Sequence, residues 1–231
     1  MIEIKDISKT YNGEKKALND ISFDINDGEI FGFIGHNGAG KTTMIKSLVG
    51  ILDFDKGDIL INKKSIKEDP IGCKLEMAYV PNNPDLYENM TAISFINFIC
   101  DMYDTPTNIR KENIEKYAKM FEIENNLNDD ISSFSHGMKQ KVALISALAH
   151  DPKVLVMDEP FVGLDPKAVF DMKNIMKEMT KEGKTIFFST HILDVAKKIS
   201  EGLARNATCG EVDGKVEDLR FIIEKDCNLV I

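Results

Sequence analysis

The sequence EIFGFIGHNGAGKTTMIKSLVGIL, residues 29–52, contains three parts that together indicate an α/β protein. Residues 29–35 are almost wholly apolar and end in a glycine, which is typical of a buried strand. Residues 41–52 carry apolar side chains at helical spacing, and Gly50 lies near their end. The glycine-rich residues between them predict a tight loop that leads from a strand directly into a helix.

The loop, residues 35–42 (GHNGAGKT), fits the pattern G-x-x-x-x-G-K-[ST] and lies between a strand and a helix, as that motif requires. In such a loop the backbone N–H groups surround phosphate oxygens, Lys41 reaches the outer phosphates, and the Thr42 hydroxyl can ligate Mg²⁺. The alternative interpretation is a glycine turn that only packs the helix against the sheet. Since a chance match would rarely have both a strand and a helix beside it, the sequence predicts a nucleoside triphosphate site.

The rest of the chain predicts a sheet with helices around it. Further apolar runs typical of buried strands are MAYV at 77–80, VLVM at 154–157 and TIFF at 185–188. Between the last two, residues 167–182 have the pattern of an amphipathic helix, and strands that alternate with helices predict a mostly parallel sheet. Residues 1–8 and 21–25 alternate apolar and polar side chains instead, which predicts half-exposed strands of an antiparallel N-terminal sheet.

Residues 84 to about 150 differ from the rest because they contain no convincing strand. Their helical patterns lie at 91–103, 108–122 and 137–149. We therefore expect a helical subdomain, at about 82–150, inserted into a core formed by residues 1–81 and 151–231. The predicted fold class is α/β: one domain, 1–231, with a P-loop NTPase core, a mostly parallel sheet, an antiparallel N-terminal sheet and this inserted subdomain.

The composition excludes several other classes of protein. Twenty-nine basic and 38 acidic residues give a net charge of -9, which argues against a general nucleic-acid-binding surface. The four cysteines are far apart and form no C-x-x-C pair, so the sequence predicts reduced thiols of a cytosolic protein and neither a disulfide scaffold nor a zinc site. No apolar run approaches the roughly 20 residues of a membrane-spanning helix, and residues 1–11 lack the apolar segment of a signal peptide.

Two carboxylates, Asp158 and Glu159, follow the apolar run at 154–157 and precede a proline. In a parallel sheet, ligands collect at the carboxyl ends of the strands, so these side chains should face the glycine loop. Asp158 would then hold Mg²⁺ through water, and Glu159 could orient and deprotonate an attacking water. The alternative is a pair of solvated residues at a strand end.

His191 directly follows the apolar run TIFFST at 185–190, again at the carboxyl end of a predicted strand. It could hydrogen-bond the γ-phosphate of a bound nucleotide. A lone histidine is more often a capping or packing residue, and His36, His136 and His150 have no metal-ligand spacing with it.

These motifs, in this order over about 190 residues, resemble the ATP-binding cassette (ABC) ATPases. The resemblance implies an α/β core with a helical subdomain, and a dimer in which two chains enclose two ATP molecules. It implies that FSHGM at 134–138 takes the place of the family's Leu-Ser-Gly-Gly-Gln signature, so that Ser135 and Gly137 approach the γ-phosphate bound by the other subunit. It further implies that residues 163–165 (GLD) cross the dimer interface and that Tyr11, 24 residues before Gly35, stacks on adenine.

The signature assignment also has support from helix geometry, because the unpaired N–H groups at the start of the 137–149 helix can bind an anion. The alternatives are a plain N-cap for Ser135 and a surface turn, TYNG, for Tyr11.

The chain departs from the family pattern at three places. His136 and Met138 replace a glycine and the glutamine of the signature, in a variant that resembles bacterial exporters of lipids, peptides and antibiotics. Asn82 stands where the family has a glutamine that touches Mg²⁺ and the attacking water, so we expect slower hydrolysis. After residue 200, where the family has two short strands, the sequence has little apolar alternation until residues 216–223.

The expected site combines the motif residues with those that the resemblance implies. The residues expected to contact ATP are Tyr11, Gly35, Asn37, Gly38, Ala39, Gly40, Lys41, Thr42, Thr43, Ser135, Gly137 and Asp165; those expected to act in catalysis are Glu159, His191 and Asn82; those expected to hold Mg²⁺ are Thr42, Asp158 and Asn82.

The leading hypothesis is an ATP-hydrolysing subunit of an exporter, with ATP and Mg²⁺ as cofactors. Its expected partners are a second ATPase subunit, in a homo- or heterodimer, and a separate transmembrane permease that docks on residues 82–103 and holds it at the cytoplasmic face of the membrane. The alternatives are a soluble ABC ATPase acting on ribosomes or DNA, a P-loop kinase or GTPase, and a catalytically weak ATP-binding module. The single glycine loop, the absence of long heptads and the lack of an Asn-Lys-x-Asp loop disfavour the first two.

Overall fold

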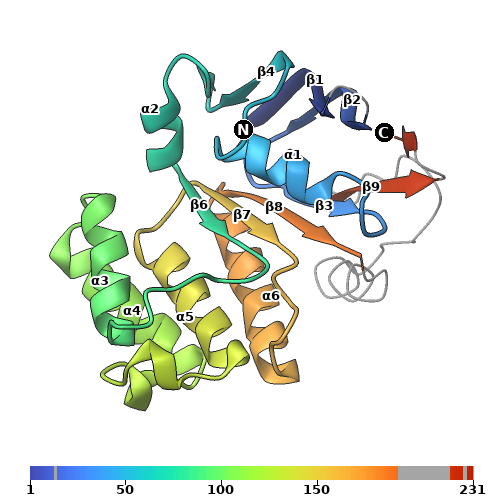
Figure 1. Ribbon diagram of the computed structural model, residues 1–231. Coiled ribbons are helices and arrows are strands. Elements are labelled where there is room, and N and C mark those ends of the chain that lie inside the picture. Colours follow the sequence, from blue (N-terminus) through green and yellow to red (C-terminus); the bar gives the residue numbers. More distant parts are fainter. Residues whose placement is uncertain (13–14, 192–218, 226–227, 231) are drawn as a thin grey trace.

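A six-stranded sheet lies at the centre of the molecule, a computed structural model that describes residues 1–12, 15–191, 219–225 and 228–230 (Figure 1). Its strands are β3 (Ile30–Ile34), β6 (Met77–Val80), β7 (Val154–Asp158), β8 (Thr185–Thr190), β9 (Leu219–Lys225) and β10 (Asn228–Val230), in the order β10-β9-β3-β8-β7-β6. The five strands from β9 to β6 are parallel, and only β10 is antiparallel to its neighbour. Because β3, β8 and β7 pair in parallel, their carboxyl ends lie side by side.

A second, four-stranded sheet is antiparallel. It consists of β1 (Ile2–Tyr11), β2 (Lys15–Ile25), β4 (Lys56–Ile61) and β5 (Lys64–Ser65), in the order β2-β1-β4-β5. This confirms the antiparallel N-terminal sheet that the alternating pattern predicted.

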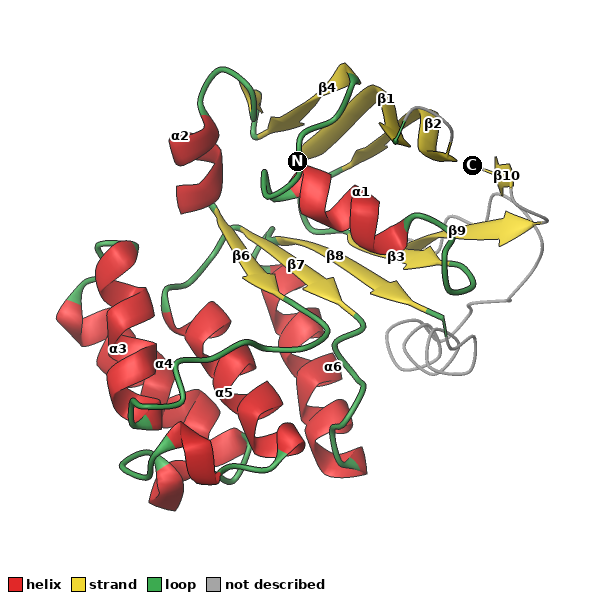
Figure 2. Cartoon of the chain, viewed as in Figure 1, coloured by secondary structure: helices red, strands yellow, loops and turns green. Residues whose placement is uncertain are grey.

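Helices cover both faces of the six-stranded sheet (Figure 2). On one face lie α3 (Ala92–Met102), α4 (Thr107–Met120), α5 (His136–Ala149) and α6 (Pro166–Lys181), with short 3₁₀ turns at Glu124–Asn126 and Ile131–Ser133. On the other face lies α1 (Lys41–Leu48), between the two sheets, and α2 (Pro70–Leu75) leads into β6.

The strands β3, β7 and β8 are buried on both faces, and their successive side chains enter two separate hydrophobic clusters. In β8, for example, Ile186 and Phe188 join the cluster with α3 to α6, while Phe187 joins the cluster with α1 and the antiparallel sheet. Two-sided burial explains why these strands read as continuous apolar runs rather than as alternating ones.

Aromatic rings join the two sheets. Phe23 of β2 stacks on Phe31 of β3 with centroids 4.7 Å apart, and Phe31 stacks on Phe187 of β8 at 5.5 Å. Such pairs contribute about 0.5–1.5 kcal/mol beyond the burial of their area. The glycine loop follows β3, so this stack holds the strand that carries the loop.

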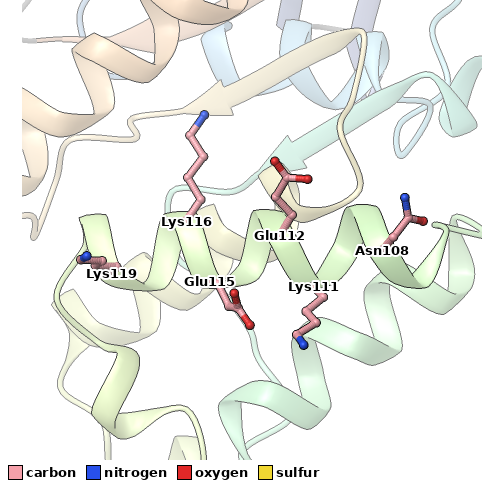
Figure 3. A pocket seen from close by; sticks show the side chains of 6 residues that line it. All are labelled: Asn108, Lys111, Glu112, Glu115, Lys116 and Lys119. Carbon is pink, nitrogen blue, oxygen red and sulfur yellow. The ribbon is translucent and has the colours of Figure 1, made fainter.

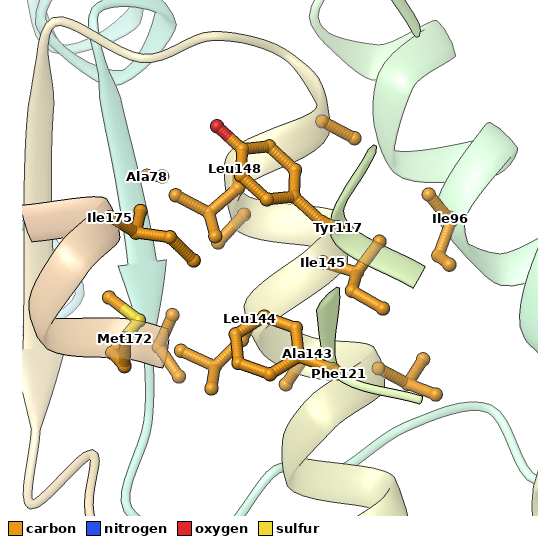
Figure 4. Close-up of a cluster of buried hydrophobic side chains, with 14 of the residues drawn as sticks. Ala78, Ile96, Tyr117, Phe121, Ala143, Leu144, Ile145, Leu148, Met172 and Ile175 are labelled. Atoms are coloured by element: carbon orange, nitrogen blue, oxygen red, sulfur yellow. The ribbon is translucent and has the colours of Figure 1, made fainter. Parts of the chain in front are cut away.

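On the other face, α5 is the centre of the helical layer. Leu144, Ile145 and Leu148 pack between side chains of α3 and α4 on one side and of α6 on the other, as Figure 4 shows for Ile96, Tyr117, Phe121, Met172 and Ile175. Nearly all of α5 after its first turn is buried, and it also contacts β6. The helices are therefore fixed to the strands that end at the site.

The predicted elements are present with shifts of a few residues, and the α/β fold class is confirmed. Residues 84–150 contain no strand, as expected. The separation of a subdomain at 82–150 from the core stays a prediction, since α5 and β6 share one hydrophobic cluster. Cys73 and Cys100 are buried free thiols, while Cys209 and Cys227 lie outside the described residues.

Three features lacked a usable signal in the sequence. β4 includes Gly57, with φ +89°, at a close approach to β1, where a Cβ atom would lie 2.2 Å from the Lys5 carbonyl oxygen. α2 has only six residues and one of them is a glycine, although Asp69 and Pro70 mark its start. β9 and β10 lie in the segment where strands were in doubt, and β9 pairs in parallel with β3; residues 201–218 lie outside the described part.

His150 ends α5 on the side of the molecule away from the strand carboxyl ends, and its ring stacks on Tyr103 with centroids 3.7 Å apart and planes 9° apart. Burial lowers the pKa of His150 to about 4, against the weaker opposite effect of Asp151. The unfolded chain takes up a proton near pH 6.5, whereas the folded chain does so only near pH 4. Between these values the unfolded state binds more protons, so stability falls as the pH falls.

We therefore expect the free energy of unfolding to decrease by roughly 2 kcal/mol between pH 7 and pH 5 through this one group. His150→Phe keeps a ring on Tyr103 and removes the titration, so its decrease should be smaller. Urea unfolding of both proteins at the two pH values measures this. Equal losses in the parent and the variant would contradict the assignment.

Candidate functional site

The glycine loop connects β3 to the first turn of α1 with its backbone close to the antiparallel sheet. Gly40, the N-cap of α1, has φ +92°, and a Cβ atom there would lie 2.5 Å from the Ala17 carbonyl oxygen. Only glycine tolerates both the conformation and the contact. No side chain of a described residue caps this end of α1, so its first N–H groups and its dipole remain available to an anion.

The ammonium group of Lys41 is folded back over the loop. Lys41 Nζ donates to the carbonyl oxygens of Gly35, at 2.6 Å, and His36, at 3.0 Å. It also lies 3.8 Å from Glu159 Oε1, which gives this buried cation a partial counter-charge. A positive charge is thus held beside the glycine loop.

Asp158, the last residue of β7, joins three segments of the chain. Its carboxylate accepts from Thr42 Oγ1 of α1, at 2.9 Å, and from Ser189 Oγ of β8, at 2.5 Å. Asp158 is only 3% exposed. Burial, and secondarily the charge of Asp158, raise the pKa of Tyr79 to about 12.

Glu159 is fixed in an unusual backbone conformation beside Asp158. It has φ +51°, which is uncommon for a non-glycine residue and costs of order 1–3 kcal/mol. Its N–H donates to Ser189 Oγ and its carboxylate accepts from the backbone N–H of His191, at 3.3 Å. His191 Nδ1 lies 2.8 Å from Glu159 Oε1, so the two side chains form a hydrogen-bonded pair.

Lys41, Thr42 and Glu159 border a cavity of about 440 Å³. The residues that line it are Tyr11, Ala17, Asn37, Gly38, Gly40, Lys41, Thr42, Thr43, Asn82 and Glu159. Tyr11 lies at its outer end, 40% exposed, with its hydroxyl 3.4 Å from Thr43 Oγ1. The structure therefore brings together most of the residues that were predicted to contact ATP.

Asn82 enters the cavity from the segment after β6. It is exposed, and its side chain forms no hydrogen bond with a described residue. No hydrogen bond to a described residue therefore fixes the Asn82 amide, and how far it reaches into the cavity depends on its own side chain alone.

Ser135, Gly137 and Asp165 are absent from the lining of this cavity. Ser135 caps α5, accepting from the Met138 N–H at 3.3 Å, as the plain N-cap interpretation predicted, and is exposed. Asp165 caps α6, accepting from the Ala168 N–H at 2.8 Å, and its pKa is lowered chiefly by Lys141. Within one chain these residues and the glycine loop form two separate groups.

A second hollow, of about 510 Å³, lies along α4 and has a different character (Figure 3). All of the residues that line it come from this one helix: Asn108, Lys111, Glu112, Glu115, Lys116 and Lys119. Opposite charges lie four residues apart, for example Glu112 and Lys116, as on a solvated helix face. It offers no convergent polar groups from other elements.

Two site residues escaped the sequence interpretation. Ser189 was detectable, because it is a hydroxyl at the carboxyl end of the same apolar strand that precedes His191. Ala17 had no signal, because it lines the cavity only through the close approach of β2 to Gly40.

The arrangement suits a polyphosphate with a divalent cation. Lys41 and the N–H groups at the start of α1 favour phosphate oxygens. A hydroxyl and a buried carboxylate 2.9 Å apart, Thr42 and Asp158, are hard oxygen donors of the kind that Mg²⁺ prefers, with water and phosphate completing its coordination. Glu159, held by His191, can accept a proton from a water in the cavity.

Comparisons with known proteins agree with this geometry. Residues 18–162 match the sequence profile of the family described as ABC transporter. Over 198 residues the chain is 35% identical to the ABC-type transporter ATP-binding protein EcsA of Bacillus subtilis (strain 168), which covers 86% of this chain and 80% of EcsA. Across eight of the curated relatives, the chain spans between 59% and 84% of the relative's own length.

Solved structures give the same result. The ATP binding subunit of an ABC transporter has a TM-score of 0.82 at 34% identity, over 86% of this chain and 82% of that chain. The dimeric ATP-binding cassette MJ0796, in a post-hydrolysis state bound to ADP and Pi, has a TM-score of 0.77 at 26% identity, over 85% of this chain and 90% of that chain. The chain thus belongs to the ABC transporter family, as an ATP-binding subunit.

Proposed function

We propose that this chain is a Mg²⁺-dependent ATPase that dimerises in the presence of ATP and so drives a separate transmembrane subunit of an exporter. The observation that carries the proposal is one cavity in which Lys41, Thr42, Asn82 and Glu159 meet from three parts of the chain. Asp158 and His191 lie outside the lining but are hydrogen-bonded to it, Asp158 through Thr42 and His191 through Glu159.

In the proposed reaction, water attacks the γ-phosphorus of ATP, and ADP and phosphate leave. The loop N–H groups and Lys41 bind the phosphates. Thr42 and Asp158 would hold Mg²⁺, which neutralises charge on the phosphate oxygens when bound. Glu159 orients the water and accepts its proton, and His191 holds Glu159 and donates to the γ-phosphate.

The proposed dimer follows from the separation of the two groups of residues. Ser135 and Gly137 stand at the start of α5, outside the lining of the chain's own cavity, and Ser135 is exposed. Free N–H groups there, with Gly137 allowing close approach, can bind the γ-phosphate of an ATP held by a second subunit, while residues 163–165 cross the interface. The dimeric form of the similar MJ0796 cassette supports this arrangement.

Coupling to a permease has its support in an apolar surface on the helical layer. Tyr87, Phe98 and Met102 are 59%, 40% and 62% exposed, and the rings of Tyr87 and Phe98 meet edge to face at 5.8 Å. We call these three residues the Tyr87 patch; it lies within residues 82–103. None of the described helices is long and apolar enough to span a membrane. We propose that a transmembrane subunit docks on this patch at the cytoplasmic face, in a subdomain formed by residues 82–150.

The direction of transport rests on sequence. The variant signature with His136 and Met138 resembles bacterial exporters, and export is proposed on that ground. Asn82 gives specific support to a second candidate, a module that binds ATP and hydrolyses it weakly, because the shorter amide weakens contact with metal and water.

Glu159→Gln should reduce ATP hydrolysis by about 100-fold or more, because it removes the group that accepts the water proton. The uncleaved ATP should hold a dimer, detectable by analytical ultracentrifugation with and without ATP. Glu178→Gln, which removes an exposed carboxylate of α6, is the matched control and should behave like the parent. A monomer that hydrolyses ATP as fast as the parent would refute the proposed roles.

Asn82→Gln should increase turnover about two- to tenfold, because an additional direct hydrogen bond from the longer amide is worth about 0.5–1.5 kcal/mol. Asn83→Gln makes the same change one residue away, outside the cavity lining, and should leave the rate unchanged. Steady-state hydrolysis in the assembled transporter measures both. An unchanged rate in Asn82→Gln would show that the shorter amide does not limit hydrolysis.

Tyr87→Ser combined with Phe98→Ser should abolish association with the permease while the isolated chain still forms its ATP-dependent dimer. The reason is the loss of apolar contact area at the Tyr87 patch. Phe170→Ser removes a 63% exposed ring from α6 and serves as the control. Capture from detergent-solubilised membranes, with identification of a protein that has several membrane-spanning helices, is the measurement. Equal capture by all variants would exclude this docking surface.

A further inference from the structure

The start of α5 and residues 163–165 are in close contact within one chain. A Cβ atom on Gly137 would lie 2.7 Å from the Gly163 carbonyl oxygen, so the two backbones touch. Gly163 has φ +81°, and a Cβ atom there would lie 2.6 Å from Cδ2 of His136. The edge of the His136 ring therefore rests on Gly163. The family signature has a glycine in the place of His136 and so has no side chain that could make this contact.

An ion pair reinforces this contact one turn further along α5. Lys141 Nζ lies 2.8 Å from Asp165 Oδ2, and the other carboxylate oxygen of Asp165 caps α6. The Lys141 side chain is 14% exposed and that of Asp165 is 48% exposed. One carboxylate thus ties the start of α5 to the start of α6 through residues 163–165.

Residues 159–164 connect this contact to the site of hydrolysis by a short path. The Val162 N–H donates to the Glu159 carbonyl oxygen at 3.2 Å, and the Leu164 N–H donates to that of Phe161 at 3.4 Å. Phe161 packs edge to face on Phe188 of β8 at 6.0 Å. Phe161 anchors these two successive turns on β8. The short segment between Gly163 and Glu159 therefore allows little independent movement of the two residues.

We propose that His136 is a positioning residue that joins the start of α5 to residues 163–165, so that the state of one ATP site is passed to the other. The inference rests on the proposed dimer. When Ser135 and Gly137 contact the γ-phosphate of the second subunit, the His136 ring carries the displacement to Gly163, and the turns carry it to Glu159 of its own site. The two sites then hydrolyse ATP cooperatively.

The test compares the ATP dependence of hydrolysis in the parent, His136→Ala and His136→Gln. The parent should have a Hill coefficient approaching about 2, the number of coupled sites. His136→Ala removes the ring without lowering helix propensity and should lower the Hill coefficient from the parent value towards about 1. His136→Gln retains a planar group of similar reach and should keep the parent value. A merely structural role would lower the melting temperature of His136→Ala without changing the coefficient.

Lys139→Ala is the matched control, because Lys139 lies on the same turn of α5 but pairs with Glu88 rather than with residues 163–165. It should keep the parent's cooperativity. If His136→Ala is as cooperative as the parent, this inference is wrong. If Glu159→Gln fails to dimerise with ATP, the proposed dimer fails and the inference fails with it, so the two outcomes are distinguishable.

Discussion

Parallel pairing of β3 with β8 and of β8 with β7 is the constraint on which the rest of the structure depends. Parallel strands end at the same edge of a sheet, so the glycine loop after β3, the carboxylates at the end of β7 and the histidine after β8 are brought to one place. The hydrogen bonds from Thr42 and Ser189 to Asp158 join the start of α1 and the end of β8 to the end of β7. The two hydrophobic clusters serve this arrangement, because each holds one face of the same strands.

The site concentrates features that are costly in an ordinary fold. Lys41, Asp158 and Glu159 are each less than a tenth exposed, and Glu159 also has a left-handed backbone. Burying charge is unfavourable unless partners compensate it, and here the loop carbonyls, two hydroxyls and one ion pair do so. Such groups are pre-oriented for a charged ligand, since the low local polarity strengthens each interaction with it.

The helical layer explains why the residues expected to bind ATP fall on two separate surfaces of one chain. The helix α5 is packed among α3, α4 and α6, and its start, with Ser135 as its cap, belongs to a different surface from the cavity. The chain thus carries a complete phosphate loop and a separate helix start, and its two departures from the family pattern, Asn82 and His136, fall one on each surface. Asn82 bears on the chemistry within a subunit, whereas His136 bears on the contact between residues 134–138 and 163–165.

The sequence by itself determined the α/β class, the strand–loop–helix of the phosphate-loop motif and the carboxylates at the end of β7, because these depend on periodicity and on residues close together in the chain. It left β4, α2 and β9 unrecognised, since each is short or is specified by a neighbouring strand rather than by its own pattern. Only the tertiary structure decided that Thr42 bonds Asp158, 116 residues away, that His191 holds Glu159, and that His136 rests on Gly163. The physical reason is that such contacts are set by strand order and helix packing, which local sequence patterns do not encode.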